Sequence, residues 1–222
     1  MNLADLKWDA SGLVTAVVQD RHTGEVRMVG HANLEAVRST LRTGQAHFFS
    51  RSRRSLWRKG ESSGHTLDVH EVWADCDGDA VIYLVDPEGP TCHTGRRTCF
   101  FRHADSSGRF TDEVDRRADP TLVRLWDTLL SRSRTSADSS YTKSLLERGA
   151  PEIGRKLREE ADELARAVAD EPTERVASEA ADVLYHLCVG LLSRDVELRD
   201  VEAELARRFG RSGHEEKASR KG

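Results

Sequence analysis

The sequence predicts a chain of two domains, an α+β domain with a small mixed or antiparallel sheet and then an all-α helical bundle. Up to about Arg102, short apolar and β-branched runs are interrupted by Gly, Asp and Asn, which is typical of strands and turns. From Pro120 onward, apolar residues recur at intervals of three and four, which is typical of amphipathic helices. A length of 222 residues is sufficient for two small domains.

The N-terminal half contains short strand candidates and one helix candidate. β-branched and aromatic residues gather in short runs, and we expect strands there, at 14–19, 26–29, 47–49, 67–73 and 80–85. We expect a helix at 34–43 that ends at Gly44, because glycine readily adopts the left-handed conformation that ends many helices.

The stretch between the two halves is polar, charged and without clear periodicity. We therefore expect a linker at 103–119, between a first domain at 1–102 and a second at 120–209. The residues at 210–222 are expected to form a polar tail. A second polar stretch, 131–140, lies inside the helical half and is expected to join its first helix to the next.

Composition limits the kinds of partner. The net charge of −4 and the isoelectric point near 6.2 predict no general attraction to nucleic acid or to anionic membranes. No apolar run approaches a membrane span, and the N-terminus lacks the pattern of a signal peptide, so we expect a cytoplasmic protein. In a reducing compartment, its four cysteines are better explained as metal ligands or buried thiols than as disulfides.

One short segment combines hard and soft metal-ligand residues. Its candidate ligands are three carboxylates and three thiols, Asp75, Asp77, Asp79, Cys76, Cys92 and Cys99. If residues 75–79 form an extended strand, the carboxylates project from one face and the thiol from the other. Carboxylate oxygens suit Mg²⁺ and thiolates suit Zn²⁺, so the segment predicts two different metals on either side of one strand.

Two other interpretations of the acidic run were considered. A calcium loop of the EF-hand kind requires Gly at its sixth position and Glu at its twelfth, where this chain has Ala80 and Asp86. The strand-like run at 80–85 also opposes a helix there, so this interpretation is rejected. A solvated turn without a metal stays open, because Asp and Gly both favour turns.

The helical half contains two amphipathic segments joined by a short break at 170–173. The apolar positions of the first are Ile153, Leu157, Ala161, Leu164 and Val168. Those of the second are Val176, Ala180, Val183, Leu184, Leu187 and Leu191. The short break predicts antiparallel neighbours, and the apolar stripes exceed what one hairpin buries, so a four-helix arrangement would need helices from a second chain.

Acidic residues of these two segments are expected to converge. Glu160 and Glu163 would face Glu179 and Asp182 across one groove, with Glu159 beside them. Carboxylates so close together repel one another unless a cation neutralises them, and Mg²⁺ bridging a polyphosphate is a natural use of such a cluster. The alternative is an ordinary solvated acidic face that forms salt bridges with neighbouring arginines.

Both halves resemble known families. The motifs of the first half are FFSRSR at 48–53, LWRKGESSGH at 56–65, DCDGD at 75–79 and CHTGRRTCF at 92–100. Those of the second are SYT at 140–142, Lys156, EEADE at 159–163, EAADVLYHL at 179–187 and EEKASR at 215–220. The first half resembles phosphoribosyl-AMP cyclohydrolase and the second phosphoribosyl-ATP pyrophosphohydrolase, whose acid pattern is shared by all-α nucleotide pyrophosphohydrolases. Together they resemble the bifunctional fusion enzymes of histidine biosynthesis.

The resemblance implies two reactions and two metals. It implies that the second half cleaves phosphoribosyl-ATP to phosphoribosyl-AMP and pyrophosphate, and that the first half opens the adenine ring of phosphoribosyl-AMP by hydrolysis. It implies Mg²⁺ at Asp75, Asp77 and Asp79, and Zn²⁺ at Cys76, Cys92 and Cys99 at a homodimer interface. In the second half the implied Mg²⁺ ligands are Glu159, Glu160, Glu163, Glu179 and Asp182.

Further roles follow from the chemistry of ring opening. Water on a zinc ion with three thiolates is less acidic than water on one with three histidines, so a general base is needed, and His93 is the candidate. The alternative is that His93 only orients a ligand. The candidates to bind the substrates are Arg51, Arg53, Trp57, Arg58, Lys59, Arg96, Arg97 and, in the second half, Lys156.

Two rival functions remain at this stage. One is a zinc-stabilised binding module fused to a helical dimerisation domain. The other is a general nucleoside triphosphate pyrophosphohydrolase with an inactive N-terminal half. Hydrolysis of both phosphoribosyl nucleotides would exclude the first, and preference for phosphoribosyl-ATP over free nucleotides would exclude the second.

Overall fold

The computed structural model describes residues 2–112, 120–136 and 140–209. The chain divides into two compact units, Met1–Pro120 and Thr121–Gly222. The expected linker at 103–119 is only partly covered by the described residues, and the expected tail at 210–222 lies outside them. In the described ranges, no helix is both long enough and apolar enough to pass through a membrane.

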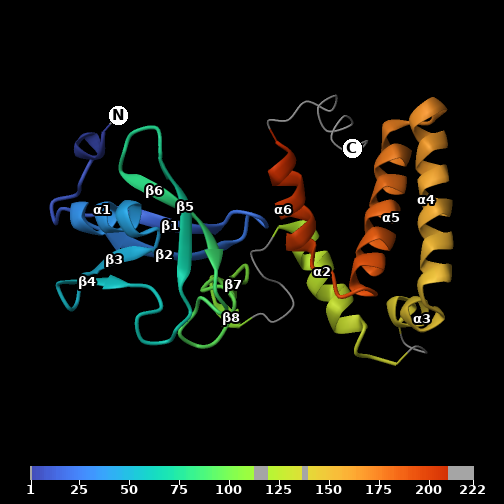
Figure 1. Ribbon diagram of the computed structural model, residues 1–222, viewed down its shortest axis with the longest axis horizontal. Helices are drawn as coiled ribbons and strands as arrows, with labels where there is room; N and C mark the ends of the chain where they lie inside the picture. Colours follow the sequence, from blue (N-terminus) through green and yellow to red (C-terminus); the bar gives the residue numbers. More distant parts are fainter. Residues whose placement is uncertain (1, 113–119, 137–139, 210–222) are drawn as a thin grey trace, which may run out of the picture. The chain divides into compact units, whose positions relative to one another are not determined.

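The first unit is built on a four-stranded sheet of order β2-β1-β6-β5. Its strands are β1 (Val14–Asp20), β2 (Val26–Ala32), β5 (Leu67–Ala74) and β6 (Ala80–Pro87). The sheet is mixed, because β1 runs antiparallel to β2 but parallel to β6, and β5 runs antiparallel to β6. The expected α+β class with a small mixed sheet is therefore confirmed for this unit (Figure 1).

The remaining elements of this unit are short. They are η1 (Leu3–Asp5), α1 (Leu34–Thr43), β3 (His47–Ser50), β4 (Ser55–Arg58), β7 (Arg102–Ala104) and β8 (Phe110–Asp112). Two-stranded antiparallel pairs are formed by β3 with β4 and by β7 with β8. Most of the β7–β8 hairpin lies in the range expected as a linker. Neither this hairpin nor β4 was predicted from the sequence.

The helix α1 begins and ends as expected. The Asn33 side chain accepts a hydrogen bond from the Ala36 amide at 2.9 Å, which satisfies one of the free N–H groups of the first turn. Gly44 ends the helix at φ 67°, in the left-handed region, and its N–H donates to the Thr40 carbonyl oxygen.

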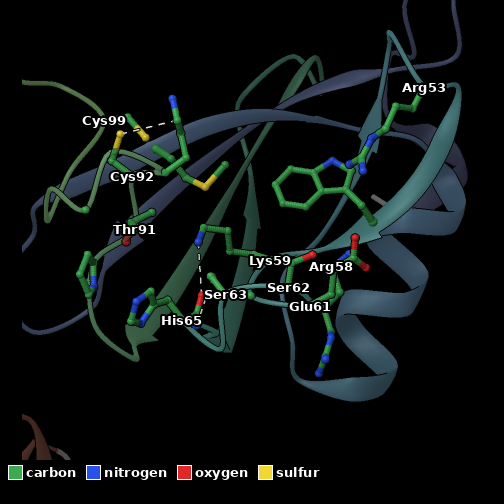
Figure 2. A pocket seen from close by; sticks show the side chains of 16 residues that line it. Arg53, Arg58, Lys59, Glu61, Ser62, Ser63, His65, Thr91, Cys92 and Cys99 are labelled. Carbon is green, nitrogen blue, oxygen red and sulfur yellow. Dashed lines mark hydrogen bonds between the residues drawn. The ribbon is translucent and has the colours of Figure 1, made fainter.

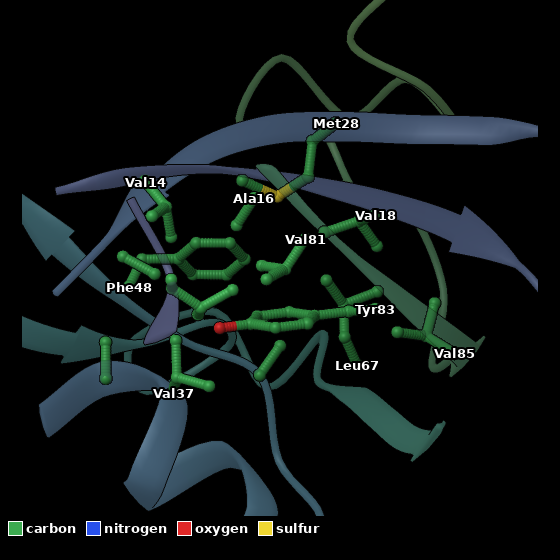
Figure 3. Close-up of a cluster of buried hydrophobic side chains, with 14 residues drawn as sticks. Val14, Ala16, Val18, Met28, Val37, Phe48, Leu67, Val81, Tyr83 and Val85 are labelled. Carbon is green, nitrogen blue, oxygen red and sulfur yellow. The ribbon is translucent and has the colours of Figure 1, made fainter. Parts of the chain in front are cut away.

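The core of the first unit surrounds two fully buried rings (Figure 3). Phe48 lies 5.8 Å from Tyr83 and stacks on Trp57 at 5.0 Å between ring centroids. Gly30 of β2 lies against Phe48, and a Cβ atom there would be 2.6 Å from the ring. The backbone of β2 therefore approaches the ring as closely as only glycine permits. Trp57 also reaches the pocket described below.

The acidic run at 75–79 is the principal correction to the secondary structure. The two-metal interpretation assumed an extended strand here, but the run forms the turn that joins β5 to β6, a conformation that the sequence had left open. Asp75 Oδ1 accepts hydrogen bonds from the amides of Gly78 (2.8 Å) and Ala80 (3.2 Å). Gly78 adopts φ 82°, which glycine tolerates and other residues rarely do. The tendency of Asp and Gly to form turns prevailed over the alternating pattern.

The second unit is all-α in its described residues, as expected. Its helices are α2 (Thr121–Arg132), α3 (Tyr141–Arg148), α4 (Ala150–Asp170), α5 (Thr173–Leu192) and α6 (Leu198–Arg208). The helices α4 and α5 lie side by side and are joined only by Glu171 and Pro172 (Figure 1). Ile153 near the start of α4 packs with Val189 near the end of α5, so the two helices are antiparallel, as predicted.

The buried positions of α4 and α5 differ from the expected apolar stripes. Glu160, Glu179 and His186 are buried, whereas Val168 is 65% exposed and Leu184 is 43% exposed. The two helices therefore pack through a face that includes acidic side chains, and much of the apolar stripe remains uncovered in the single chain. Cys188 is completely buried, as expected, and burial raises the pKa of its thiol.

Candidate active sites

A pocket of about 510 Å³ opens beside the β3–β4 hairpin of the first unit. This volume is in the usual range of small-ligand sites. Figure 2 shows Cys92 and Cys99 on one side of the pocket, Arg53 on the opposite side and Lys59 between them. The described residues that line it are Met28, Arg53, Trp57, Arg58, Lys59, Gly60, Glu61, Ser62, Ser63, His65, Pro90, Thr91, Cys92, His93, Gly95 and Cys99.

Cys92 and Cys99 are neighbours in this pocket, and their thiols have different pKa values. Burial raises the pKa of Cys92, but hydrogen bonds from Thr94 outweigh it, with the Thr94 hydroxyl 3.1 Å from the sulfur, so the net shift is downward. Desolvation and the neighbouring Cys92 raise the pKa of Cys99 to about 11. Two sulfurs so placed are a donor pair that a soft cation such as Zn²⁺ suits.

Cys76 stands apart from this pair. It is exposed on the β5–β6 turn and is absent from the residues that line the pocket in the described part of the chain. The single chain therefore brings together two of the three predicted zinc ligands and leaves the third elsewhere.

The three aspartates of the β5–β6 turn do converge. One carboxylate oxygen from each of Asp75, Asp77 and Asp79 lies within 4.8 Å of the others. The charge of Asp77 raises the pKa of Asp79, while hydrogen bonds from the turn outweigh desolvation and lower that of Asp75. Lys7 reaches Asp77 at 3.3 Å and compensates part of this charge. The oxygen donors fit a hard cation such as Mg²⁺.

His93 follows Cys92 directly and is exposed on the pocket wall. Its Nδ1 lies 3.9 Å from the Cys92 sulfur. The ring is therefore close enough to act on a group bound at the thiols.

The predicted substrate-binding residues separate into two sets. Arg53, Trp57, Arg58 and Lys59 line the pocket. Burial lowers the pKa of Lys59, although the nearby thiols oppose this shift. Arg51 is exposed and, like Arg96 and Arg97, does not line the pocket in the described residues.

The two arginines before Cys99 have partners of their own. Arg96 pairs with Asp112 at 3.2 Å and lies over the Phe101 ring, 4.1 Å from its centroid. Arg97 Nε donates to Glu25. These contacts give both guanidinium groups a structural role.

Several pocket residues were not identified as site residues from the sequence. They are Met28, Glu61, Ser62, Ser63, His65 and Thr91. Most belong to the GESSGH run at 60–65, which was part of the motif that carries the family resemblance but was given no role of its own. Gly60 adopts φ 87°, and a Cβ atom there would lie 2.7 Å from the backbone of His65, so this glycine fixes the loop that forms the pocket floor.

In the second unit, an acidic cluster lies in the groove between α4 and α5. Glu160, Glu179 and Asp182 each place a carboxylate oxygen within 4.8 Å of the others. Glu160 and Glu179 are buried, and Asp182 is exposed. Burial raises the pKa of Glu179 despite its ion pair with Arg175 at 2.6 Å. The predicted convergence is therefore present for these three residues.

The other two predicted ligands lie at the edge of this cluster. Glu163 is near enough to Glu179 to raise its pKa. Glu159 turns toward cations instead, 2.8 Å from Arg155 and 3.2 Å from Lys156. Lys156 also lies 3.3 Å from Glu160, so it compensates the charge of the cluster.

A polar group beside the cluster was not predicted from the sequence. His186 is buried, with Nδ1 3.0 Å from the Asp182 carbonyl oxygen and 3.8 Å from a Glu160 carboxylate oxygen. Tyr141 packs edge-on against the His186 ring, and Tyr185 shares a hydrogen bond with Thr142 at 2.8 Å. These residues lie in the SYT and EAADVLYHL motifs that carry the resemblance, but no role was assigned to any of them from the sequence.

Comparison with known proteins matches each half of the chain to a family. Residues 28–101 match the family model for phosphoribosyl-AMP cyclohydrolase, and residues 122–209 match that for phosphoribosyl-ATP pyrophosphohydrolase. The histidine biosynthesis bifunctional protein HisIE of Wolinella succinogenes is 44% identical over 99% of this chain and 97% of its own length. This chain belongs to the HisIE family.

Other members of the HisIE family have similar coverage. The HisIE protein of Thermus thermophilus is 43% identical over 92% of this chain and 92% of its own length. The chloroplastic HisIE protein of Arabidopsis thaliana is 43% identical over 99% of this chain and 80% of its own length.

The HisIE chain is a bifunctional hydrolase of histidine biosynthesis that acts on small phosphoribosyl nucleotides. Its C-terminal half is the phosphoribosyl-ATP pyrophosphohydrolase, and its N-terminal half is the phosphoribosyl-AMP cyclohydrolase. The expected family and pair of activities are confirmed. Neither rival is favoured, because both family models match one chain in the expected order.

Proposed function

We propose that ring opening occurs in the pocket between the thiol pair and Arg53, with His93 as general base. Zinc would be held by Cys92 and Cys99 with Cys76 as the third ligand. When bound, the zinc would lower the pKa of a water molecule and so supply the nucleophile. His93 Nδ1, 3.9 Å from the Cys92 sulfur, is placed to accept a proton there.

The pocket walls support a nucleotide substrate of this size. Trp57 presents an aromatic face for the purine, and Arg53 and Lys59 are cations for the two phosphate groups. Magnesium would be held by Asp75, Asp77 and Asp79, whose clustered negative charge needs a counter-ion.

We further propose that the zinc site is shared between two copies of the chain. The observation that carries this proposal is that Cys76 is exposed on the β5–β6 turn and absent from the described pocket lining, whereas Cys92 and Cys99 lie inside it. A Cys76 from a second copy would complete the ligand set. A homodimer also suits the uncovered apolar residues of α4 and α5, Val168 and Leu184 among them.

In the second unit, Mg²⁺ would be held by Glu160, Glu179 and Asp182, with Glu163 beside them. When bound, the metal would neutralise the triphosphate of phosphoribosyl-ATP. Glu159 and Lys156 form an ion pair at 3.2 Å on the same helix. Glu159 would therefore hold Lys156 beside the cluster rather than serve as a ligand, and Lys156 would bind a phosphate group by exchanging a carboxylate partner for it.

Mixing two inactive variants tests the shared zinc site. Cys76→Ala and Cys92→Ala are each expected to lose ring opening while still releasing pyrophosphate. If ligands come from two copies, refolding the two variants together restores about a quarter of wild-type ring opening, because half of the dimers are mixed and each has one complete site.

Two controls make the mixing experiment decisive. Each variant refolded alone must stay inactive in ring opening, and pyrophosphate release reports that the chain has folded. If the mixture is no more active than the separate variants although mixed dimers form, all three thiols belong to one chain and the shared site is wrong.

A further inference from the structure

Two charged residues at the start of β2, Glu25 just before the strand and Arg27 within it, are almost completely buried. Glu25 is 1% exposed and Arg27 is 4% exposed. Charged side chains are rarely buried to this extent unless they are paired, because removing an ion from water is costly. Neither residue lines the pocket or belongs to an acidic cluster in the described part of the chain. Their burial therefore needs another explanation.

Arg27 holds the segment that leads into Cys92. Its Nη2 donates to the Gly89 carbonyl oxygen at 3.2 Å, and its Nε donates to Thr91 Oγ1 at 3.2 Å. Gly89 adopts φ 82°, and a Cβ atom there would lie 2.7 Å from His65 Nδ1, so this segment is also confined on its other side. Thr91 directly precedes Cys92, and Arg27 thus fixes the chain one residue before the first thiol.

Glu25 connects Arg27 to the far end of the loop. One carboxylate oxygen accepts from Arg27 Nη1 at 2.9 Å, and the other accepts from Arg97 Nε at 3.1 Å. The carboxylate therefore lies between two guanidinium groups, one from the strand and one from the loop. Charge-assisted hydrogen bonds of this kind are strong and directional, particularly where water is excluded.

The backbone of the same strand holds the second thiol. Thr98 Oγ1 donates to the Val26 carbonyl oxygen at 2.8 Å, and the Cys99 amide donates to the Arg27 carbonyl oxygen at 2.9 Å. Residues 25–27 thus contact the loop next to both thiols. The Arg27 side chain binds the loop beside Cys92, and the Arg27 backbone binds it at Cys99.

We propose that Glu25 and Arg27 are positioning residues that set the separation of Cys92 and Cys99 for metal binding. This inference rests on the proposed function, in which these thiols hold zinc. Both residues lie outside 28–101, the range matched by the cyclohydrolase model. The contacts described above, rather than the family motifs, point to them.

The test is the affinity of the full-length protein for Co²⁺, a coloured substitute for zinc, measured by competition with a chelator. Arg27→Lys keeps the charge but loses the planar fork, and Glu25→Gln keeps the shape but loses the charge. Both are expected to weaken Co²⁺ binding about 10- to 100-fold, as loss of an outer partner of a metal ligand typically does. The thiolate-to-Co²⁺ absorption band should change as well.

Arg21→Lys is the matched control. Arg21 pairs with Asp86 at 2.8 Å in the same unit, and within the described residues this ion pair does not involve the thiol loop. The same chemical change should leave Co²⁺ affinity within about twofold of wild type, since an outer partner acts only through the ligands that it touches.

Cys92→Ala separates failure of this inference from failure of the zinc proposal. If Cys92→Ala keeps the wild-type Co²⁺ band, the thiols do not hold the metal and the zinc proposal itself is wrong. If it loses the band while Arg27→Lys and Glu25→Gln keep wild-type affinity, only the positioning role is wrong. A lowered unfolding temperature of the metal-free protein with unchanged affinity would have the same meaning.

Milder variants decide the matter if Arg27→Lys and Glu25→Gln fail to fold. Thr91→Val removes the hydrogen bond that Arg27 Nε donates to the loop, and Thr98→Val removes those that the loop donates to the Val26 and Arg27 carbonyl oxygens, with little change in volume. Weaker Co²⁺ binding by these variants supports the positioning role, and unchanged binding overturns it.

Discussion

The two units differ in how the chain brings their metal-ligand residues together. In the second unit, Glu160, Glu179 and Asp182 come from two regular helices joined by a two-residue connection. In the first unit, Cys92 and Cys99 lie on an irregular loop held by residues near position 25.

The difference shows what fixes each site. The helical cluster needs only the helical repeat and one short hairpin, and both are local properties of the sequence. The thiol pair depends on contacts between segments far apart in the chain, including the buried Glu25 and Arg27. We therefore expect the first site to be more sensitive than the second to changes remote from its ligands.

Removing one carboxylate from the acidic cluster of the second unit should have the largest effect, and it should impair one activity without the other. Asp182→Asn is expected to reduce pyrophosphate release about 100- to 1,000-fold, because an electrostatic contact to the reacting phosphates is lost. Ring opening of supplied phosphoribosyl-AMP should be unchanged. Both steps are measured on the full chain, by pyrophosphate release and by the absorbance change of the purine.

Asp162→Asn is the control for this variant. Asp162 is an exposed acid of α4 outside the acidic cluster, so its activity should match wild type in both steps. Equal losses for Asp162→Asn and Asp182→Asn would mean that the total negative charge of the helical unit, and not the cluster, supports pyrophosphate release.

A change in the core of the first unit should give an intermediate effect. Gly30→Ala places a methyl group 2.6 Å from the buried Phe48 ring, which is enclosed by Trp57 and Tyr83. Overpacking of this kind typically costs about 1–3 kcal/mol of unfolding free energy. Hydrogen exchange resolved by peptide should show the loss in the first unit only.

The same substitution in the second unit should act in the opposite direction. A Cβ atom at Gly154 of α4 would meet only the end of Arg158, at an ordinary 3.5 Å. Because alanine favours helix, Gly154→Ala should stabilise the second unit by about 0.5–1 kcal/mol. If Gly30→Ala left the unfolding free energy of the first unit unchanged, the close approach of β2 to the Phe48 ring would have no energetic consequence.

The smallest effect is expected at the Asp86 ion pairs, and it depends on pH. Burial raises the pKa of Asp86, but its hydrogen bonds and ion pair with Arg21, with smaller contributions from His22 and His70, lower it below its usual value. This stabilisation is therefore present above the ordinary carboxyl pKa of about 4 and is lost as the pH falls through the lower pKa of the folded state.

Denaturant unfolding across this pH range tests the expectation. Because these ion pairs are partly exposed to solvent, Asp86→Asn should destabilise the first unit by only about 0.5 kcal/mol at pH 7. The difference from wild type should shrink as the pH falls below about 4. A constant difference down to pH 2 would show that the Asp86 side chain acts by shape and not by charge.

The sequence predicted most elements whose pattern is local. The helix α1 was predicted to the residue because Gly44 ends it, and the antiparallel α4–α5 pair followed from the short connection at Glu171 and Pro172. The β7–β8 hairpin was missed because its strands are three residues long and polar, which leaves no apolar repeat to detect.

What the sequence did not predict was set by tertiary contacts. The two-metal interpretation assumed an extended strand at 75–79, but Asp75 bonds to the amides of its own turn. The burial of Glu160 and Glu179 was missed because charge alone suggests exposure, whereas a shared groove with neighbouring cations makes burial tolerable. Ser62 and Thr91 line the pocket without a charge or a metal-ligand group, so their residue types alone did not mark them as site candidates.

The parallel pairing of β1 with β6 has a consequence for how the chain folds. Thr15 pairs with Ala80, so the centre of the first sheet closes only after most of that unit has been synthesised. The closest packing in the second unit joins α4 to α5, which follow one another directly, and such local contacts form faster. During synthesis, β1 therefore waits for a partner, whereas α4 finds α5 almost as soon as that helix emerges from the ribosome.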